Sequence, residues 1–141
     1  MDAAISNYHA IKNQIGEGTK ICCVIKAEGY GHGAVELAKL INGEIISADS
    51  MQIYDEMDIG TAKPTIEEMD GVKHYLIGNV SPTTRYSVAN YKKDASLAIE
   101  EILQKGKTPI IVGGTGLYVD SLVQGIEYDD LFQEGICRKK H

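Results

Sequence analysis

The sequence lacks any apolar run near the roughly 20 residues that a membrane-spanning helix needs. It also lacks a basic start followed by an apolar stretch, the pattern of a signal peptide. We therefore expect no membrane association and a cytoplasmic location. Basic residues are scarce too: 14 Lys and Arg stand against 20 Asp and Glu, a formal net charge of −6. Such a chain lacks the basic face with which a stand-alone nucleic-acid-binding protein replaces counterions.

Cysteine is equally sparse, with three in the chain, and two of them, Cys22 and Cys23, are adjacent within an apolar run. Neighbouring side chains of a strand point to opposite faces, so these two thiols cannot easily form a disulfide with each other. No CxxC and no Cys/His metal spacing occurs in the sequence. We expect reduced thiols, as in a cytoplasmic protein, and no metal bound through cysteine.

Alternating strand and helix patterns fill most of the 141 residues. Strands are predicted at 21–25, 44–48, 72–77 and 109–112, largely from continuous apolar runs typical of strands buried on both faces. Helices are predicted at 3–15, 34–41, 87–105 and 117–123, with a short one from Thr65. This order favours an α/β fold with a parallel sheet. We assign 1–129 to one domain and 130–141, which has no periodicity, to a tail.

Glycine-rich or polar segments follow three of the predicted strands. AEGYGHG follows the first strand, ADSMQIY the second and GGTG the fourth. In an open parallel sheet, ligands bind beyond the carboxyl ends of the strands. We therefore expect any functional site at these three segments.

A long stretch of the chain resembles the tRNA dimethylallyltransferase (tRNA isopentenyltransferase) family over residues 37–129. The matching text is NGEIISADSMQIYDEMDIGTAKPTIEEMDGVKHYLI, then YSVANYKKDA, then KGKTPIIVGGTGLYVDSLVQGIEYD. The resemblance implies a three-layer parallel sheet like the core of a P-loop nucleoside triphosphate hydrolase, truncated in this chain. The family transfers a dimethylallyl group from its diphosphate to an adenine amine next to the tRNA anticodon. The resemblance therefore implies tRNA, dimethylallyl diphosphate and Mg²⁺ as partners.

The same resemblance implies roles for individual residues. Asp49 matches the general base that takes a proton from adenine N6. Ser50, Met51 and Gln52 match the stretch that contacts the flipped-out adenine, and an amide such as Gln52 can hydrogen-bond a base edge. Thr115 matches a tRNA-contacting position, where neighbouring glycines let backbone N–H groups approach a phosphate. Without the resemblance, the Asp-Ser pair would be interpreted as a helix N-cap or an Asx turn, which are local structural roles.

The phosphate-binding pattern of that family, GxxxxGK followed by Ser or Thr, is not matched here. Gly29 can occupy the second glycine position, but Val24 stands at the first. Tyr30 and Gly31 stand where the lysine and the hydroxyl residue belong. The chain thus lacks the ammonium group that grips phosphate and the hydroxyl that holds Mg²⁺. We expect a transferase-like fragment that is catalytically silent as it stands and binds no cofactor firmly.

Residues 2–36 carry a second resemblance, to the start of alanine racemase, above all in VIKAEGYGHG. It implies that Lys26 forms a Schiff base with pyridoxal phosphate, a role that suits a lysine whose pKa burial has lowered. A solvated lysine at a strand end is the alternative interpretation. His32 is expected to be a turn or surface histidine. We interpret the chain as a chimera of a racemase-like segment, 1–36, and a transferase-like core, 37–129.

Three functions remain open from the sequence. The first is a tRNA prenyl transferase with Asp49 as base, and the second is a fragment that binds pyridoxal phosphate through Lys26. The third is a recombinant or engineered chimeric α/β fold without enzymatic function. A parallel sheet with missing strands exposes an edge that can pair with another chain, so we also expect a homo-oligomer formed through that edge.

Overall fold

The computed structural model describes residues 2–15, 19, 21, 23–25, 33–57 and 60–124. Its elements follow the predicted order and are α1 (Asp2–Gln14), β1 (Cys23–Ile25), α2 (Ala34–Leu40), β2 (Gly43–Ser47), α3 (Ile66–Met69), β3 (His74–Tyr75), α4 (Val88–Gln104), β4 (Thr108–Val112) and α5 (Gly116–Val123). The α/β fold class is thereby confirmed. Cys22, Lys26, Gly29–His32 and the tail 130–141 lie outside the described residues.

The third strand is shorter than the predicted 72–77. It covers His74 and Tyr75 only, because Leu76 has a φ of 60°, in the left-handed region that interrupts an extended chain. Gly78 follows with a φ of 63°. An apolar run in the sequence cannot reveal such a reversal of the backbone.

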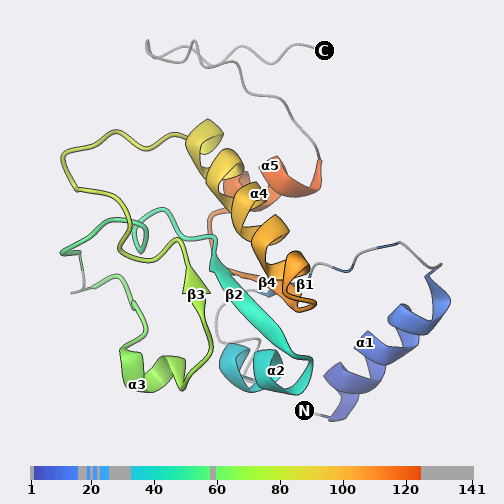
Figure 1. Cartoon of the computed structure of the whole chain (residues 1–141). Coiled ribbons are helices and arrows are strands. Elements are labelled where there is room, and N and C mark those ends of the chain that lie inside the picture. Colours follow the sequence, from blue (N-terminus) through green and yellow to red (C-terminus); the bar gives the residue numbers. More distant parts are fainter. Residues whose placement is uncertain are drawn as a thin grey trace.

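The described strands form one parallel sheet in the order β1-β4-β2-β3 (Figure 1). β4 lies between β1 and β2, and its register with β2 runs from Gly43 opposite Thr108 to Ser47 opposite Val112. The carboxyl ends of β2 and β4 are therefore level with each other. The segments that follow these two strands, 48–52 and 113–116, therefore start next to each other although they are far apart in the sequence.

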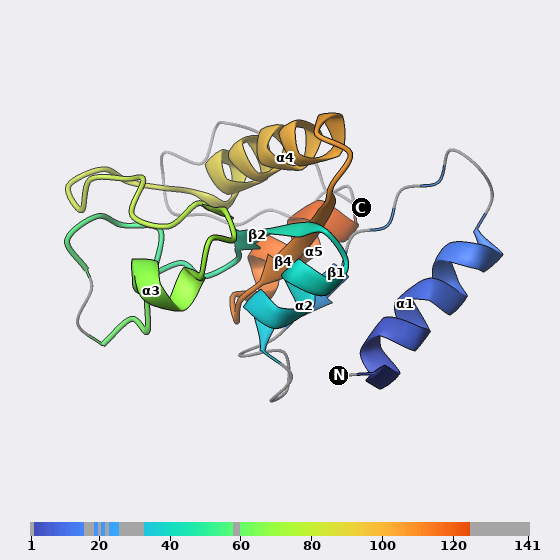
Figure 2. The ribbon, with the colours of Figure 1, turned by 60° about the horizontal axis from the view of Figure 1, so that its bottom comes forward.

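Helices cover both faces of the sheet, which confirms the three-layer arrangement (Figure 2). Alternate side chains of a strand point to opposite faces. Ile46 and Ile111 pack in a cluster with α4 and α5, whereas Ile45 and Ile110 pack with α2. The helix residues buried against the sheet are Tyr91, Ala95, Ala98, Ile102 and Tyr118 on one side and Ala38 on the other. Among the described residues, no helix is both long and apolar enough to span a membrane.

The predicted helix caps are present. Thr65 Oγ1 accepts a hydrogen bond from the Glu68 N–H (3.2 Å), while the Glu68 carboxylate accepts one from the Thr65 N–H (2.8 Å). Ser87 and Asn90 form the same reciprocal arrangement at the start of α4. These caps satisfy backbone donors that the first helical turn leaves without partners. They fix where α3 and α4 begin.

A buried carboxylate lies near the amino-terminal end of β2. Glu44 is 4% exposed and accepts hydrogen bonds from Lys107 (2.8 Å), Lys105 (3.3 Å) and the Tyr75 hydroxyl (2.8 Å). Burial favours the neutral acid, but these hydrogen bonds together hold the pKa of the Glu44 carboxyl below its ordinary value. Glu101 joins the cluster through Lys105 (2.7 Å) and accepts from the Tyr75 hydroxyl (3.0 Å), so ion pairs and hydrogen bonds together link β2, β3 and α4.

The loop after β4 lies very close to the chain that follows β2. A Cβ atom added to Gly113 would lie 2.4 Å from both the carbonyl carbon and the carbonyl oxygen of Ala48. Flanking hydrogen bonds run from the Ala48 N–H to the Val112 oxygen (2.7 Å) and from the Thr115 N–H to the Ala48 oxygen (3.0 Å). The close approach therefore requires glycine at position 113. Gly114, by contrast, has open space around its Cβ position.

The Lys107→Met variant should lower the free energy of unfolding by about 1–3 kcal/mol, because one oxygen of buried Glu44 loses its donor. Chemical denaturation measures the change. The pKa of Glu44 is lowered from 4.5 in the folded state, so the stabilisation is present above that value and is lost as the pH falls below it. Lys93→Met changes an exposed lysine of α4 and is the control, expected within about 0.5 kcal/mol of wild type. Equal stabilities of the two variants would contradict the expectation.

Gly113→Ala should destabilise the fold by roughly 1–3 kcal/mol, because the new methyl group must displace the Ala48 backbone. Gly114→Ala introduces the same methyl group one residue later, into open space, and should change stability much less. Thermal unfolding of both variants makes the comparison. A Gly114→Ala variant at least as destabilised as Gly113→Ala would refute the close-approach explanation.

Candidate functional site

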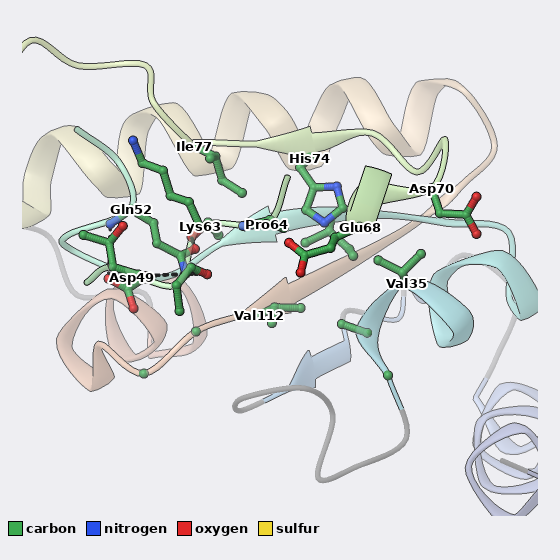
Figure 3. Close-up of a pocket in the computed structure, with 18 of the residues that line it drawn as sticks. Val35, Asp49, Gln52, Lys63, Pro64, Glu68, Asp70, His74, Ile77 and Val112 are labelled. Carbon is green, nitrogen blue, oxygen red and sulfur yellow. Dashed lines mark hydrogen bonds between the residues drawn. The ribbon is translucent and has the colours of Figure 1, made fainter. Parts of the chain in front are cut away.

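A cavity of about 1140 Å³ opens beyond the carboxyl ends of β2 and β4 (Figure 3). Its walls come from α2, from the loop after β2, from residues 61–64, from α3 and from the glycine loop after β4. Asp49, Gln52 and Lys63 lie at one end of the cavity, and Glu68, Asp70 and His74 lie at the other. The position agrees with the expectation that ligands bind beyond the strand ends.

Asp49 is half-buried in the cavity wall, two residues after the end of β2. Its Oδ1 atom accepts hydrogen bonds from the backbone N–H groups of Met51 (2.8 Å) and Gln52 (3.3 Å). This is the Asx turn that an Asp-Ser pair favours. Within the described residues, Oδ2 accepts no hydrogen bond, so the turn orients the carboxylate and leaves one oxygen for other partners.

Thr115 and Ser50 are in contact although 65 residues separate them in the chain. The Ser50 N–H donates to Thr115 Oγ1 at 3.0 Å. Thr115 occupies the N-cap position of α5, but its side chain makes no cap hydrogen bond. The hydroxyl instead joins the loop after β4 to the residue next to Asp49. Met51 follows with 47% of its surface exposed, and it is not among the residues that line the cavity.

The Gln52 side chain is engaged inside the protein. Its Oε1 accepts a hydrogen bond from Ser47 Oγ (3.1 Å), and its Nε2 donates to the carbonyl oxygens of Thr61 (3.1 Å) and Ala62 (3.0 Å). Both amide hydrogens therefore have acceptors. The role of Gln52 in contacting a base remains a prediction, as do the roles of Ser50, Met51 and Thr115.

His74 and Lys63 line the cavity but carry no motif that marks them in the sequence. His74 is half-buried and its Nδ1 donates to the Val72 carbonyl oxygen (2.8 Å). Burial lowers the pKa of His74, which favours the neutral imidazole with its other nitrogen as an acceptor. Glu68 lines the same end of the cavity as His74 (Figure 3). Lys63 Nζ donates to the Tyr54 carbonyl oxygen (2.5 Å).

Acidic side chains outnumber basic ones around the cavity. The carboxylates in the described lining are those of Glu36, Asp49, Glu67, Glu68 and Asp70. No group of three or more His, Cys, Asp or Glu residues suited to a metal ion occurs in the described parts of the chain. Lys26, the predicted pyridoxal phosphate lysine, is outside the described residues.

Two family models match the chain. The model described as IPP transferase matches residues 52–139, and the model described as alanine racemase, N-terminal domain, matches residues 1–70. The two matches overlap at residues 52–70.

Curated relatives and solved structures agree with the first of these families. A tRNA dimethylallyltransferase of Acetivibrio thermocellus is 56% identical over 114 residues, which cover 81% of this chain and 36% of that protein. One of Staphylococcus haemolyticus is 55% identical over 104 residues, with 74% and 31% covered. The crystal structure of a full-length tRNA isopentenylpyrophosphate transferase of Bacillus halodurans matches with a TM-score of 0.74 and 46% identity, covering 80% of this chain and 38% of that one. A eukaryotic dimethylallyltransferase acting on tRNA matches with a TM-score of 0.72 and 29% identity, covering 85% and 31%.

The extent of these matches bears on where the transferase resemblance starts. An alignment of 114 residues within 141 must include residues 28–114, so it begins at least nine residues before residue 37. The chain spans about a third of the length of these curated relatives. Because the family model covers more than half of its residues, this chain belongs to the IPP transferase family.

Proposed function

We propose that this chain carries the adenine side of a dimethylallyl-transfer site, with Asp49 as the general base. The observation that carries the proposal is the position of Asp49, half-buried in the cavity beyond β2 and oriented by two backbone N–H groups. Relatives more than 50% identical to this chain are named tRNA dimethylallyltransferases, which supports the choice of reaction.

The proposed step joins adenine to the dimethylallyl group. The adenine N6 nitrogen attacks C1 of dimethylallyl diphosphate, the bond from C1 to the diphosphate oxygen breaks, and its electron pair leaves with the diphosphate. The proton lost from N6 moves to the Asp49 carboxylate, whose Oδ2 has no hydrogen bond among the described residues. Ser50 and Thr115 are the proposed contacts to the RNA, and the exposed Met51 side chain offers an apolar surface to the adenine ring.

Binding of the diphosphate is the step that this chain is not equipped to perform. Val24, Tyr30 and Gly31 replace the glycine, lysine and hydroxyl residue of the phosphate-binding pattern. The carboxylates around the cavity would repel an anionic donor rather than hold it. We therefore propose that the chain is catalytically silent as it stands.

Restoring the pattern tests this proposal. The combined variant Val24→Gly, Tyr30→Lys, Gly31→Thr recreates GxxxxGKT, and dimethylallyl diphosphate with Mg²⁺ should then raise the melting temperature, because a ligand that binds the folded state stabilises it. The wild-type chain should show no such rise. A rise in the wild type would show that the chain binds the donor already. No rise in the variant would refute the assignment of this segment to diphosphate binding.

The same restored variant tests the base. It should transfer dimethylallyl to an anticodon stem-loop RNA, and adding Asp49→Asn should lower the rate at least about 100-fold while the rise in melting temperature is kept. Asp55→Asn, which alters an exposed carboxylate that does not line the cavity, is the matched control. Equal rates for the Asp49 and Asp55 variants would exclude Asp49 as the base.

A second candidate function is favoured by the racemase model that matches residues 1–70. In this candidate function, Lys26 forms a Schiff base with pyridoxal phosphate, the role that the resemblance of the VIKAEGYGHG segment implies. Incubation with this cofactor should then give a visible Schiff-base absorbance, which Lys26→Ala removes and Lys12→Ala retains. A colourless protein after incubation would eliminate this candidate.

The chimeric origin of the chain is a further proposal. The racemase match supports a racemase-like start, and the transferase alignment includes residues from 28 onward, so the two resemblances share a region around α2. A joint there is physically reasonable, because both families place a strand, a glycine turn and a helix at this point. Sequencing the gene across codons 20–45 for one continuous reading frame checks it.

A further inference from the structure

Gln52 connects two walls of the cavity. On one side, Ser47 Oγ at the end of β2, a residue only 3% exposed, donates to Gln52 Oε1 at 3.1 Å. On the other side, Gln52 Nε2 donates to the carbonyl oxygens of Thr61 and Ala62, at 3.1 and 3.0 Å. Both N–H donors of the primary amide are therefore in use, and its oxygen accepts one hydrogen bond. The side chain thus forms a bridge from the sheet to the 61–62 wall.

The backbone of the same residue is attached to the proposed base. The Gln52 N–H donates to Asp49 Oδ1 at 3.3 Å, and the Gln52 carbonyl oxygen accepts from the Gly78 N–H at 2.9 Å. One residue therefore contacts the carboxylate, the end of β2 and the opposite wall. A displacement of Gln52 would move Asp49 and the 61–62 wall relative to each other.

The 61–62 wall contains a residue in a rarely adopted backbone conformation, which contacts from the rest of the protein must hold in place. Ala62 has a φ of 49°, in the left-handed region that L-residues rarely adopt. Thr61 Oγ1 donates to the Met57 carbonyl oxygen (2.5 Å), and Lys63 Nζ donates to the Tyr54 carbonyl oxygen (2.5 Å). These contacts attach the loop to its neighbours in sequence. The Gln52 amide attaches it to the sheet.

We propose that Gln52 is a positioning residue that sets the width of the cavity between Asp49 and the 61–62 wall and does not itself read the base. An adenine edge could reach the amide hydrogens only by displacing the Thr61 or Ala62 carbonyl. The effect of Gln52 on catalysis rests on the proposed function of Asp49. Its role in holding the 61–62 wall to the sheet does not depend on that function. The two claims can therefore fail separately.

Methyl NMR tests the bridge without any substrate. Gln52→Glu has nearly the same shape but removes both donors and places a carboxylate against two carbonyl oxygens. The methyl signals of Thr61 and Ala62 should shift or broaden, while that of Ala95 in the core stays in place. Gln104→Glu, on the exposed end of α4, makes the same chemical change elsewhere and should alter neither signal. Unchanged Thr61 and Ala62 signals in the Gln52 variant would overturn the proposal.

Acidification gives a second readout. Protonation of the introduced carboxylate restores one O–H donor. The Thr61 and Ala62 signals of Gln52→Glu should therefore return part of the way to their wild-type positions as the pH falls from 7 to 4. The same signals of the wild type should not show this pH dependence. A pH-independent difference would mean that the change acts through packing and not through the donors, and would also overturn the proposal.

Kinetics of the variant with the restored phosphate-binding pattern separate positioning from base reading. A positioning role predicts that Gln52→Glu lowers kcat for dimethylallyl transfer at least tenfold and changes KM for the stem-loop RNA less than twofold. A rise in KM with kcat preserved would show that the amide reads the base, against the proposal. Absence of transfer in the restored variant itself would contradict the proposed function, and the NMR result would still decide the bridge.

Discussion

The parallel pairing of β2 with β4 is the interaction on which the rest of the structure depends. Its register sets Ser47 opposite Val112, so both strands end at the same level. The chain beyond Ser47 then meets the loop after Val112, where Gly113 approaches the Ala48 backbone too closely for any side chain. Thr115 can reach the Ser50 N–H only because of this approach. A shift of register by one residue would separate these segments and reverse the faces of the isoleucines.

The two carboxylates of β2 and its extension show how environment decides what a charge does. Glu44, near the amino end, is buried and surrounded by Lys105, Lys107 and the Tyr75 hydroxyl. Both of its oxygens accept hydrogen bonds that serve the fold, and its lowered pKa keeps it ionised. Asp49, at the other end, is half-buried, and its Oδ1 alone is bonded within the described residues. The first carboxylate holds elements together, and the second is oriented but remains available for chemistry.

Much of this arrangement is local and could be predicted from the sequence. Apolar runs located β2 and β4, Thr65 and Ser87 marked the starts of two helices, and the Asp-Ser pair indicated the turn at Asp49. These features depend on neighbours within four residues. The early end of β3 depends on the left-handed backbone of Leu76. Leucine does not favour that conformation, so the residue type gives no sign that the strand ends there.

The long-range contacts of the site could not be predicted from local sequence patterns. The hydroxyl of Thr115 and the amide of Gln52 are both used within the protein, on partners that the fold chooses. Family resemblance located these residues at the site but assigned them to RNA and adenine. His74 enters the cavity from a two-residue strand, and only the pairing of β3 with β2 brings it there. Side-chain roles of this kind follow from tertiary geometry and not from residue spacing.

The charges of the cavity separate the two halves of the proposed chemistry. A carboxylate-rich wall does not repel adenine, which is neutral, and its negative potential favours the departure of a proton from the adenine amine. The same negative potential repels phosphate groups. A diphosphate donor needs the opposite field, and in the family pattern a lysine and a hydroxyl residue supply it at positions that Tyr30 and Gly31 occupy here. The proton-accepting half can therefore be intact in a chain whose donor-binding half is not, because different residues with opposite electrostatic requirements build the two halves.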